Sequence, residues 1–200
     1  MDTLTSKVVL LGDGSVGKTS IKKRFVGLQF EGTYMATMGA DFTIKEHKYK
    51  TSDGNNIILK FMIWDLAGQT RYNAVRPHYY VGSHSALLIY DVTNFNSVDS
   101  ILNWVTEFKK TVHHSVPITL IGNKVDLRDD LNVPGLTYED GLKLSHKVND
   151  LVSKLDSQAG NYNYFKVNFY ETSAKTGANI NQAFDSLAEH LYMRYLAENR

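Results

Sequence analysis

The stretch Gly12-Asp13-Gly14-Ser15-Val16-Gly17-Lys18-Thr19 decides the fold of this chain. It has the spacing G-x-x-x-x-G-K-T, which is the pattern of a loop that holds a phosphate group. The apolar run Val8–Leu11 before it is typical of a buried parallel strand, and Ser20–Phe25 after it suits a first helix. An ordinary glycine-rich turn is the alternative, but the strand, loop and helix that the motif requires are all present. We therefore predict that this loop binds phosphate.

The chemistry of the loop follows from its residue types. Glycines let the backbone curl so that successive N–H groups point at one anion, and the N-terminus of the next helix adds its positive dipole end. Lys18 supplies a positive charge for the β and γ phosphates of a nucleotide. Thr19 can give its hydroxyl oxygen to Mg²⁺, a cation that prefers oxygen ligands.

The composition narrows the class of protein. The chain has 200 residues, and we expect one domain that spans residues 1–200. Lys and Arg total 22 against 21 for Asp and Glu, so the net charge of +1 offers no basic footprint, and we expect no nucleic-acid partner. Because the chain has no cysteine, it cannot form disulfides or carry a prenyl or palmitoyl group. No apolar run approaches the ~20 residues of a membrane span, so we expect a cytoplasmic protein without a direct lipid anchor or lipidated C-terminal tail.

Strand-like apolar runs alternate with helical patterns, which predicts an α/β fold with a mostly parallel sheet and helices on both faces. The exception to the parallel order is a hairpin in residues 42–64, where Phe42–Tyr49 and Ile57–Trp64 flank the turn signal Ser52–Asn55. Further strands are expected at 85–90, 117–121 and 165–170, and helical spacing of apolar residues is found at 101–112, 137–155 and 180–191.

The segment Trp64-Asp65-Leu66-Ala67-Gly68-Gln69 narrows the chemistry further. Asp65 at the end of a strand can organise the water shell of Mg²⁺, although a strand-end aspartate is often only a helix cap. Gly68 can offer its backbone N–H to a γ-phosphate. Gln69 can orient a water molecule for in-line attack on it. The segment therefore adds hydrolysis to phosphate binding.

The segment Asn123-Lys124-Val125-Asp126 points to guanine. The carboxylate of Asp126 can accept hydrogen bonds from N1–H and the exocyclic amine of guanine, whereas adenine would leave this carboxylate unpaired at a large free-energy cost. Taken alone, the four residues also suit a polar loop without function. The segment Glu171-Thr172-Ser173-Ala174-Lys175 follows the last expected strand, and its backbone N–H groups can meet the base O6.

With these motifs in this order across nearly the whole chain, the sequence resembles the small GTPases of the Ras superfamily. The Rab branch is the most similar, because four further segments are close to Rab signatures: Tyr34–Phe42, Trp64-Asp65, Tyr79–Gly82 and Tyr90–Thr93. The resemblance implies a P-loop NTPase fold, a three-layer sandwich with a six-stranded sheet.

The resemblance also implies a site. It makes Gln69 the catalytic residue and assigns Thr19, Thr37 and Asp65 to the metal ion. It places Phe30 beside the guanine and Tyr34 over the phosphates. The residues expected to bind the nucleotide are Gly14, Ser15, Val16, Gly17, Lys18, Thr19, Ser20, Phe30, Tyr34, Thr37, Gly68, Asn123, Lys124, Asp126, Leu127, Ser173, Ala174 and Lys175.

The implied activity is the hydrolysis of GTP to GDP and phosphate with Mg²⁺, in a monomeric switch. Exchange factor, GTPase-activating protein and effectors are expected to bind through residues 31–42 and 68–80. No arginine lies in Glu31–Ala36, so we expect slow intrinsic hydrolysis that a partner's arginine accelerates.

Two other functions stay open at this point. One is a GTP-binding signalling module with little or no hydrolysis, against which Gln69, Thr37 and Thr19 argue. The other is an ATPase or kinase with the same phosphate loop, against which Asp126 argues.

The interval between Asn123–Asp126 and Glu171–Lys175 is longer than in typical Rab proteins, and we place an insertion at about 153–165. We expect a solvent-exposed surface loop there. The alternative is a binding surface with Tyr162 and Tyr164 as anchors.

Overall fold

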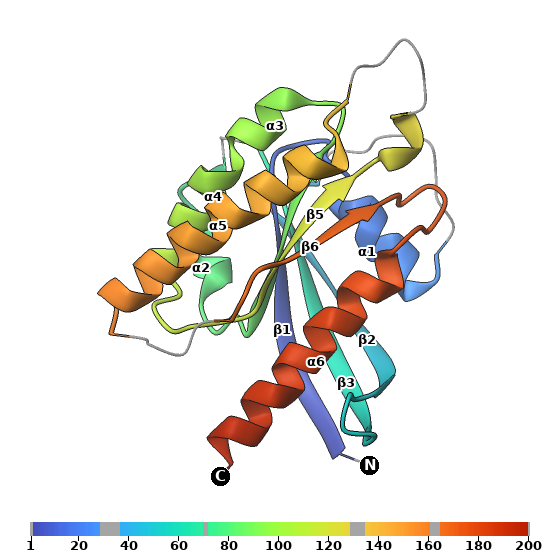
Figure 1. Ribbon diagram of the computed structural model, residues 1–200, viewed down its shortest axis with the longest axis vertical. Coiled ribbons are helices and arrows are strands. Elements are labelled where there is room, and N and C mark those ends of the chain that lie inside the picture. Colours follow the sequence, from blue (N-terminus) through green and yellow to red (C-terminus); the bar gives the residue numbers. More distant parts are fainter. Residues whose placement is uncertain (1, 29–36, 70–71, 129–134, 161–164, 200) are drawn as a thin grey trace.

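A six-stranded sheet forms the middle of the molecule in the computed structural model, which describes residues 2–28, 37–69, 72–128, 135–160 and 165–199 (Figure 1). The strand order is β2-β3-β1-β4-β5-β6. The strands are β1 (Asp2–Leu11), β2 (Ala40–Lys50), β3 (Asn56–Leu66), β4 (Ser85–Asp91), β5 (Ile118–Asn123) and β6 (Asn168–Thr172).

All neighbouring strands are parallel except β2 and β3, which form the predicted antiparallel hairpin. The turn between them is closed by the N–H of Thr51, which donates to the carbonyl of Asn55 over 2.8 Å, and Gly54 has a positive φ of 89°. The predicted mostly parallel sheet with one antiparallel strand is therefore confirmed.

Helices cover both faces of this sheet, as predicted (Figure 1). One face carries α1 and α6, and the other carries α2 to α5. The helices are α1 (Lys18–Val26), α2 (Arg76–Tyr80), α3 (Phe95–Asp99), α4 (Ile101–Lys109), the single turn η2 (Val125–Leu127), α5 (Tyr138–Gln158) and α6 (Ile180–Glu198). Among the residues that the structure describes, no helix is both long and apolar enough to cross a membrane.

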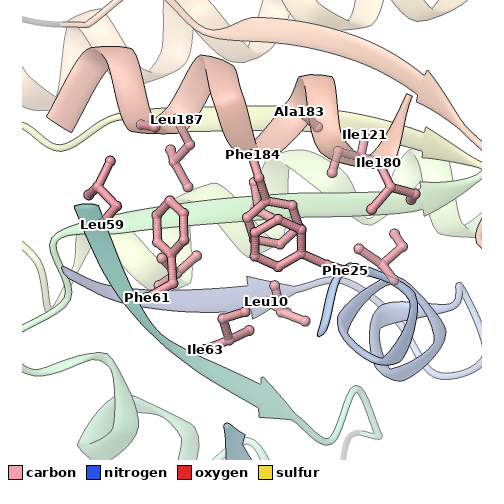
Figure 2. Packing of buried hydrophobic residues seen from close by; sticks show 14 of the residues in the cluster. Leu10, Phe25, Leu59, Phe61, Ile63, Ile121, Ile180, Ala183, Phe184 and Leu187 are labelled. Atoms are coloured by element: carbon pink, nitrogen blue, oxygen red, sulfur yellow. The ribbon is translucent and has the colours of Figure 1, made fainter. Parts of the chain in front are cut away.

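An aromatic cluster fixes α1 on its face of the sheet (Figure 2). The rings of Phe25 in α1 and Phe184 in α6 stack with centroids 3.5 Å apart, and Phe61 of β3 meets both rings edge-on. Burial of one such side chain contributes about 1.5–3 kcal/mol. This packing holds the end of α1 firmly, so its beginning, directly after the phosphate loop, has a fixed direction.

The long helix α5 begins as predicted but ends later. Thr137 and Asp140 form a capping box at its start, in which each side chain accepts from the other's backbone N–H. The helix continues to Gln158 rather than to Leu155. The extra turn is held because the buried Asp156 pairs with the buried Lys109 of α4.

The last strand begins at Asn168, so the predicted strand at 165–170 was placed three residues too early. The reason is a hydrogen bond: the N–H of Val167 donates to the side-chain oxygen of Asn149 in α5 over 3.1 Å and is not available to β5. Of the expected insertion at 153–165, residues 157–160 are exposed, in line with a surface segment. Tyr162 and Tyr164 lie outside the described residues.

Candidate functional site

The predicted site residues follow the carboxyl ends of neighbouring strands. Leu11 ends β1, Leu66 ends β3, Asn123 ends β5 and Thr172 ends β6. In a parallel sheet these ends share one edge, which is where ligands of open α/β sheets bind. The sheet therefore gathers the loops that are far apart in the sequence.

The phosphate loop has a conformation that requires glycine at its end. Gly17 has a φ of 99°, and a Cβ there would lie 2.2 Å from the side-chain nitrogen of Asn123. The ammonium of Lys18 donates to the carbonyls of Gly12 (2.7 Å) and Asp13 (2.6 Å). Burial lowers the pKa of Lys18 to about 8, against the opposing effect of Asp65 and Asp13. The loop thus holds a desolvated cation at its centre.

Oxygen atoms of three separate elements meet beside this loop. Thr19 of α1 donates from its hydroxyl to Asp65 Oδ2 of β3 over 2.5 Å, and the hydroxyls of Thr19 and Thr37 lie 3.1 Å apart. Asp65 is fully buried, and its Oδ1 makes no hydrogen bond among the described residues. Burial raises the pKa of Asp65, while Thr19, Lys22 and Lys18 oppose this shift.

A buried carboxylate with one unpaired oxygen, next to two hydroxyls, fits a hard cation such as Mg²⁺. These are the three residues predicted for the metal ion. The geometry of these three residues is therefore compatible with that prediction.

The loop after β3 lies directly against the phosphate loop. A Cβ on Gly68 would come within 2.4–2.5 Å of the backbone of Asp13, Gly12 and Gly14, so only glycine fits without a shift. The side chain of Gln69 lies close to Gly14 of the phosphate loop. A Cβ added to Gly14 would lie 3.9 Å from Gln69 Cγ. The predicted catalytic side chain thus stands beside the loop predicted to hold the phosphates.

Asn123 ties three loops together. Its side-chain nitrogen donates to the carbonyl of Val16 in the phosphate loop over 2.9 Å. Its side-chain oxygen accepts from the hydroxyl of Thr172 (3.1 Å) and the N–H of Ala174 (3.2 Å). Because Asn123 is buried, these bonds are shielded from water and join the phosphate loop to the segment 171–175.

The residues predicted to meet a base lie around this junction. The hydroxyl of Ser173 donates to Asp126 Oδ1 over 2.5 Å, and among the described residues no hydrogen bond engages the other carboxylate oxygen. Lys124 has a positive φ of 70°, and its ammonium pairs with Asp91 at the end of β4 over 2.6 Å. Leu127 ends the turn η2 and is half-buried.

A further polar network joins the site to α4. The indole N–H of Trp104 donates to Asp13 Oδ1 over 2.7 Å, and the guanidinium of Arg76 lies 4.1 Å from the Trp104 ring. Arg76 also donates twice to Glu107 (2.9 and 2.7 Å) and reaches the carbonyl of Gln69 at 3.4 Å. The network contacts the phosphate loop at Asp13 and the loop after β3 at Gln69. The sequence analysis did not predict it. The available signal was that a core tryptophan must find an acceptor for its N–H.

The structure brings the predicted site residues together in two groups, apart from two residues that it does not describe. Phe30 and Tyr34, like the rest of 29–36, lie outside the described residues. One group surrounds the start of α1 and comprises Gly14, Ser15, Val16, Gly17, Lys18, Thr19, Ser20, Thr37, Asp65, Gly68 and Gln69. The other group surrounds the ends of β5 and β6 and comprises Asn123, Lys124, Asp126, Leu127, Ser173, Ala174 and the exposed Lys175.

The chain is similar to known proteins along nearly its whole length. Residues 7–193 match the model of the Ras family. Human Ras-related protein Rab-26 is 38% identical over 189 residues, which cover 94% of this chain and 64% of Rab-26, so the chain spans somewhat less than two thirds of that relative. The GTP-binding protein YPT53 of Saccharomyces cerevisiae is 42% identical over 94% of this chain and 76% of its own length. Human Ras-related protein Rab-37 is 38% identical over 96% of this chain and 75% of its own length. The chain therefore belongs to the Ras family, and its sequence is Rab-like.

Proposed function

We propose that the protein is a small GTPase: a switch that binds GTP and GDP with Mg²⁺ and hydrolyses GTP to GDP and phosphate. The observation that supports this most is the side chain of Asn123, which bonds to the phosphate loop at Val16 and to the segment of Ala174. The two segments proposed to hold the phosphates and the guanine are thereby joined by buried hydrogen bonds, which favours a guanine nucleotide over phosphate alone as the ligand.

The guanine would be read by Asp126. Its free carboxylate oxygen can accept from N1–H or the exocyclic amine, while the bond from Ser173 holds the carboxylate in place. In the segment 173–175, the N–H of Ser173 donates to the carbonyl of Ala178 and that of Ala174 to Asn123, so the N–H of Lys175 would be the donor for the base O6. An adenine would leave the charged acceptor without a donor, which disfavours ATP.

Lys18, Thr19, Thr37 and Asp65 would hold the charged end of the nucleotide. Mg²⁺, when bound, neutralises charge on the β and γ phosphate oxygens. The ammonium of Lys18 donates to two carbonyls of its own loop, and it would donate to the phosphate oxygens when a nucleotide is bound. Thr37 precedes β2, so its engagement would couple the phosphates to the segment at 31–42.

Hydrolysis would take place between the phosphate loop and Gln69. Water attacks the γ-phosphorus, the bond to the β–γ bridging oxygen breaks, GDP leaves, and both protons of the water end on the phosphate product as H₂PO₄⁻. Gln69 would orient this water, and its backbone is held by Arg76. The alternative, a module that binds GTP without hydrolysis, is disfavoured because Gln69 is present beside the loop.

One experiment tests the proposal directly. Binding of GTP and ATP and release of phosphate are measured with and without Mg²⁺. We expect binding of GTP, little binding of ATP and slow, Mg²⁺-dependent release of phosphate. Tighter binding of ATP would overturn the base assignment, and GTP binding without any phosphate release would favour the module without hydrolysis.

Replacing Gln69 by leucine is expected to lower the rate of GTP hydrolysis by about tenfold and to leave GTP affinity unchanged, because the side chain positions the water rather than the nucleotide. Single-turnover phosphate release measures the rate. Gln182→Leu makes the same change on the exposed face of α6 and serves as the control. Equal rates in Gln69→Leu and the wild type would remove Gln69 from its role.

Partners would bind at an apolar patch next to the site. Phe42 of β2 is 53% exposed, and its ring lies 5.3 Å from that of Trp64, which in turn lies 5.8 Å from Tyr79. Met38 and Ile44 extend the patch and are exposed as well. Exposed apolar clusters of this kind mark interaction sites. We propose that effectors and regulators of a cytoplasmic, monomeric switch bind here, over residues 31–42 and 68–80.

A further inference from the structure

Lys22 is a buried lysine beside the candidate metal site. It lies on α1 one turn after Thr19, and only 3% of it is exposed. Its ammonium forms an ion pair with Asp41 of β2 and lies 3.8 Å from Asp65 Oδ2 of β3. Lysines are rarely this buried without a paired charge, so these two carboxylates explain its position.

The two carboxylates also need the lysine. Asp41 and Asp65 stand directly opposite each other in the antiparallel ladder of β2 and β3. Like charges at such positions are destabilising. Asp65 is buried whereas the Asp41 side chain is 65% exposed, so water screens this repulsion only in part. Lys22 supplies the compensating charge when no metal ion is bound.

We propose that Lys22 acts as a built-in cation that weakens the binding of Mg²⁺ to the nucleotide complex. A divalent ion at Thr19, Thr37 and Asp65 would meet a fixed positive charge next to its own carboxylate. Asp41 has the opposite effect, since it draws the ammonium away from Asp65. This inference rests on the proposed nucleotide-binding function.

The size of the effect follows from the charges involved. Even at an effective dielectric constant of about 20, a unit charge a few ångströms from another changes an equilibrium constant by more than tenfold. Removing the charge of Lys22 should therefore lower the Mg²⁺ concentration at half-saturation by about tenfold or more. Neutralising Asp41 should raise this concentration, because Lys22 is then free to approach Asp65.

The experiment uses the full chain loaded with a fluorescent GDP analogue in buffers of set free Mg²⁺ concentration. The midpoint at which Mg²⁺ slows release of the analogue is compared for the wild type, Lys22→Met, Lys22→Arg and Asp41→Asn. Lys48→Met, the same loss of charge at an exposed position of β2, is the control and should match the wild type. We expect a lower midpoint for Lys22→Met, a higher one for Asp41→Asn and a nearly unchanged one for Lys22→Arg.

Thermal unfolding in EDTA and in Mg²⁺ provides a second readout. Lys22→Met should lose stability in EDTA and recover much of it with Mg²⁺, because the metal ion then neutralises the two carboxylates. If Lys22→Met loses the same stability in both buffers and its Mg²⁺ midpoint for release of the analogue equals that of the wild type, Lys22 has a structural role only and the inference is overturned. If Lys22→Met does not fold, Asp41→Asn decides, and a midpoint that does not rise overturns it. Failure of the wild type to bind the analogue would instead overturn the proposed function.

Discussion

The substitution Asp126→Asn is expected to weaken binding of GDP and GTP by about 10²–10³-fold. The carboxylate would accept from guanine at a place where Ser173 already holds one of its oxygens. Removing one partner of a buried, charged hydrogen-bonded pair costs about 2–5 kcal/mol. An asparagine also presents an N–H₂ group, which repels the donors of guanine but can donate to the extra carbonyl of xanthine. Affinity for xanthine nucleotides should therefore rise.

Competition binding with GDP, XDP and ADP against one fluorescent nucleotide measures this change of preference. Asp99→Asn makes the same substitution at an exposed position at the end of α3 and should bind like the wild type. An unchanged order of GDP over XDP in Asp126→Asn would show that the base is read elsewhere. That outcome would leave the assignment of the phosphate loop unchanged, because it does not test the roles of Lys18 and Thr19.

Local signals explain why so much of the fold could be predicted. In the hairpin of β2 and β3, the alternating residues 42–49 and the largely apolar run 57–64 flank a turn that contains Gly54, and these features lie within a few residues of one another. The start of α5 was predicted from the helical spacing of apolar residues, and the structure supplies a local reason for it in the capping box of Thr137 and Asp140. The motif residues stand at or directly after the ends of strands, so the prediction of a mostly parallel sheet was enough to bring them to one edge.

The features that could not be predicted depend on side chains that meet across large sequence distances. The end of α5 is set by Asp156 and its partner Lys109, and the start of β6 by the bond from Val167 to Asn149. Spacing along the chain does not reveal such partners. Lys22 shows this most clearly, since a lysine in a helix would be expected to face water.

The substitution Gly68→Ala is expected to lower GTP hydrolysis by about 10²-fold. The added Cβ would lie 2.4 Å from the carbonyl carbon of Asp13 and 2.5 Å from Gly14 N. Both atoms belong to the backbone of the phosphate loop, which cannot turn aside as the end of a side chain can. The loop that carries Gln69 must therefore move away, and a displacement of about 1 Å at a reacting group can cost 10²-fold in rate.

Affinity for GDP should change less than hydrolysis in Gly68→Ala, because Lys18, Thr19 and Asp126 do not take part in the clash and the loop that carries Gln69 is the part expected to move. Gly14→Ala is the matched control: the same methyl group is added to the facing loop, where it would meet Gln69 Cγ at 3.9 Å, an ordinary contact. Its effect on hydrolysis should be clearly smaller, and again larger on turnover than on binding. Single-turnover phosphate release, with GDP affinity measured in parallel, separates these cases. Hydrolysis at the wild-type rate in Gly68→Ala would mean that the two loops separate during turnover, so that their contact does not place Gln69 for the reaction.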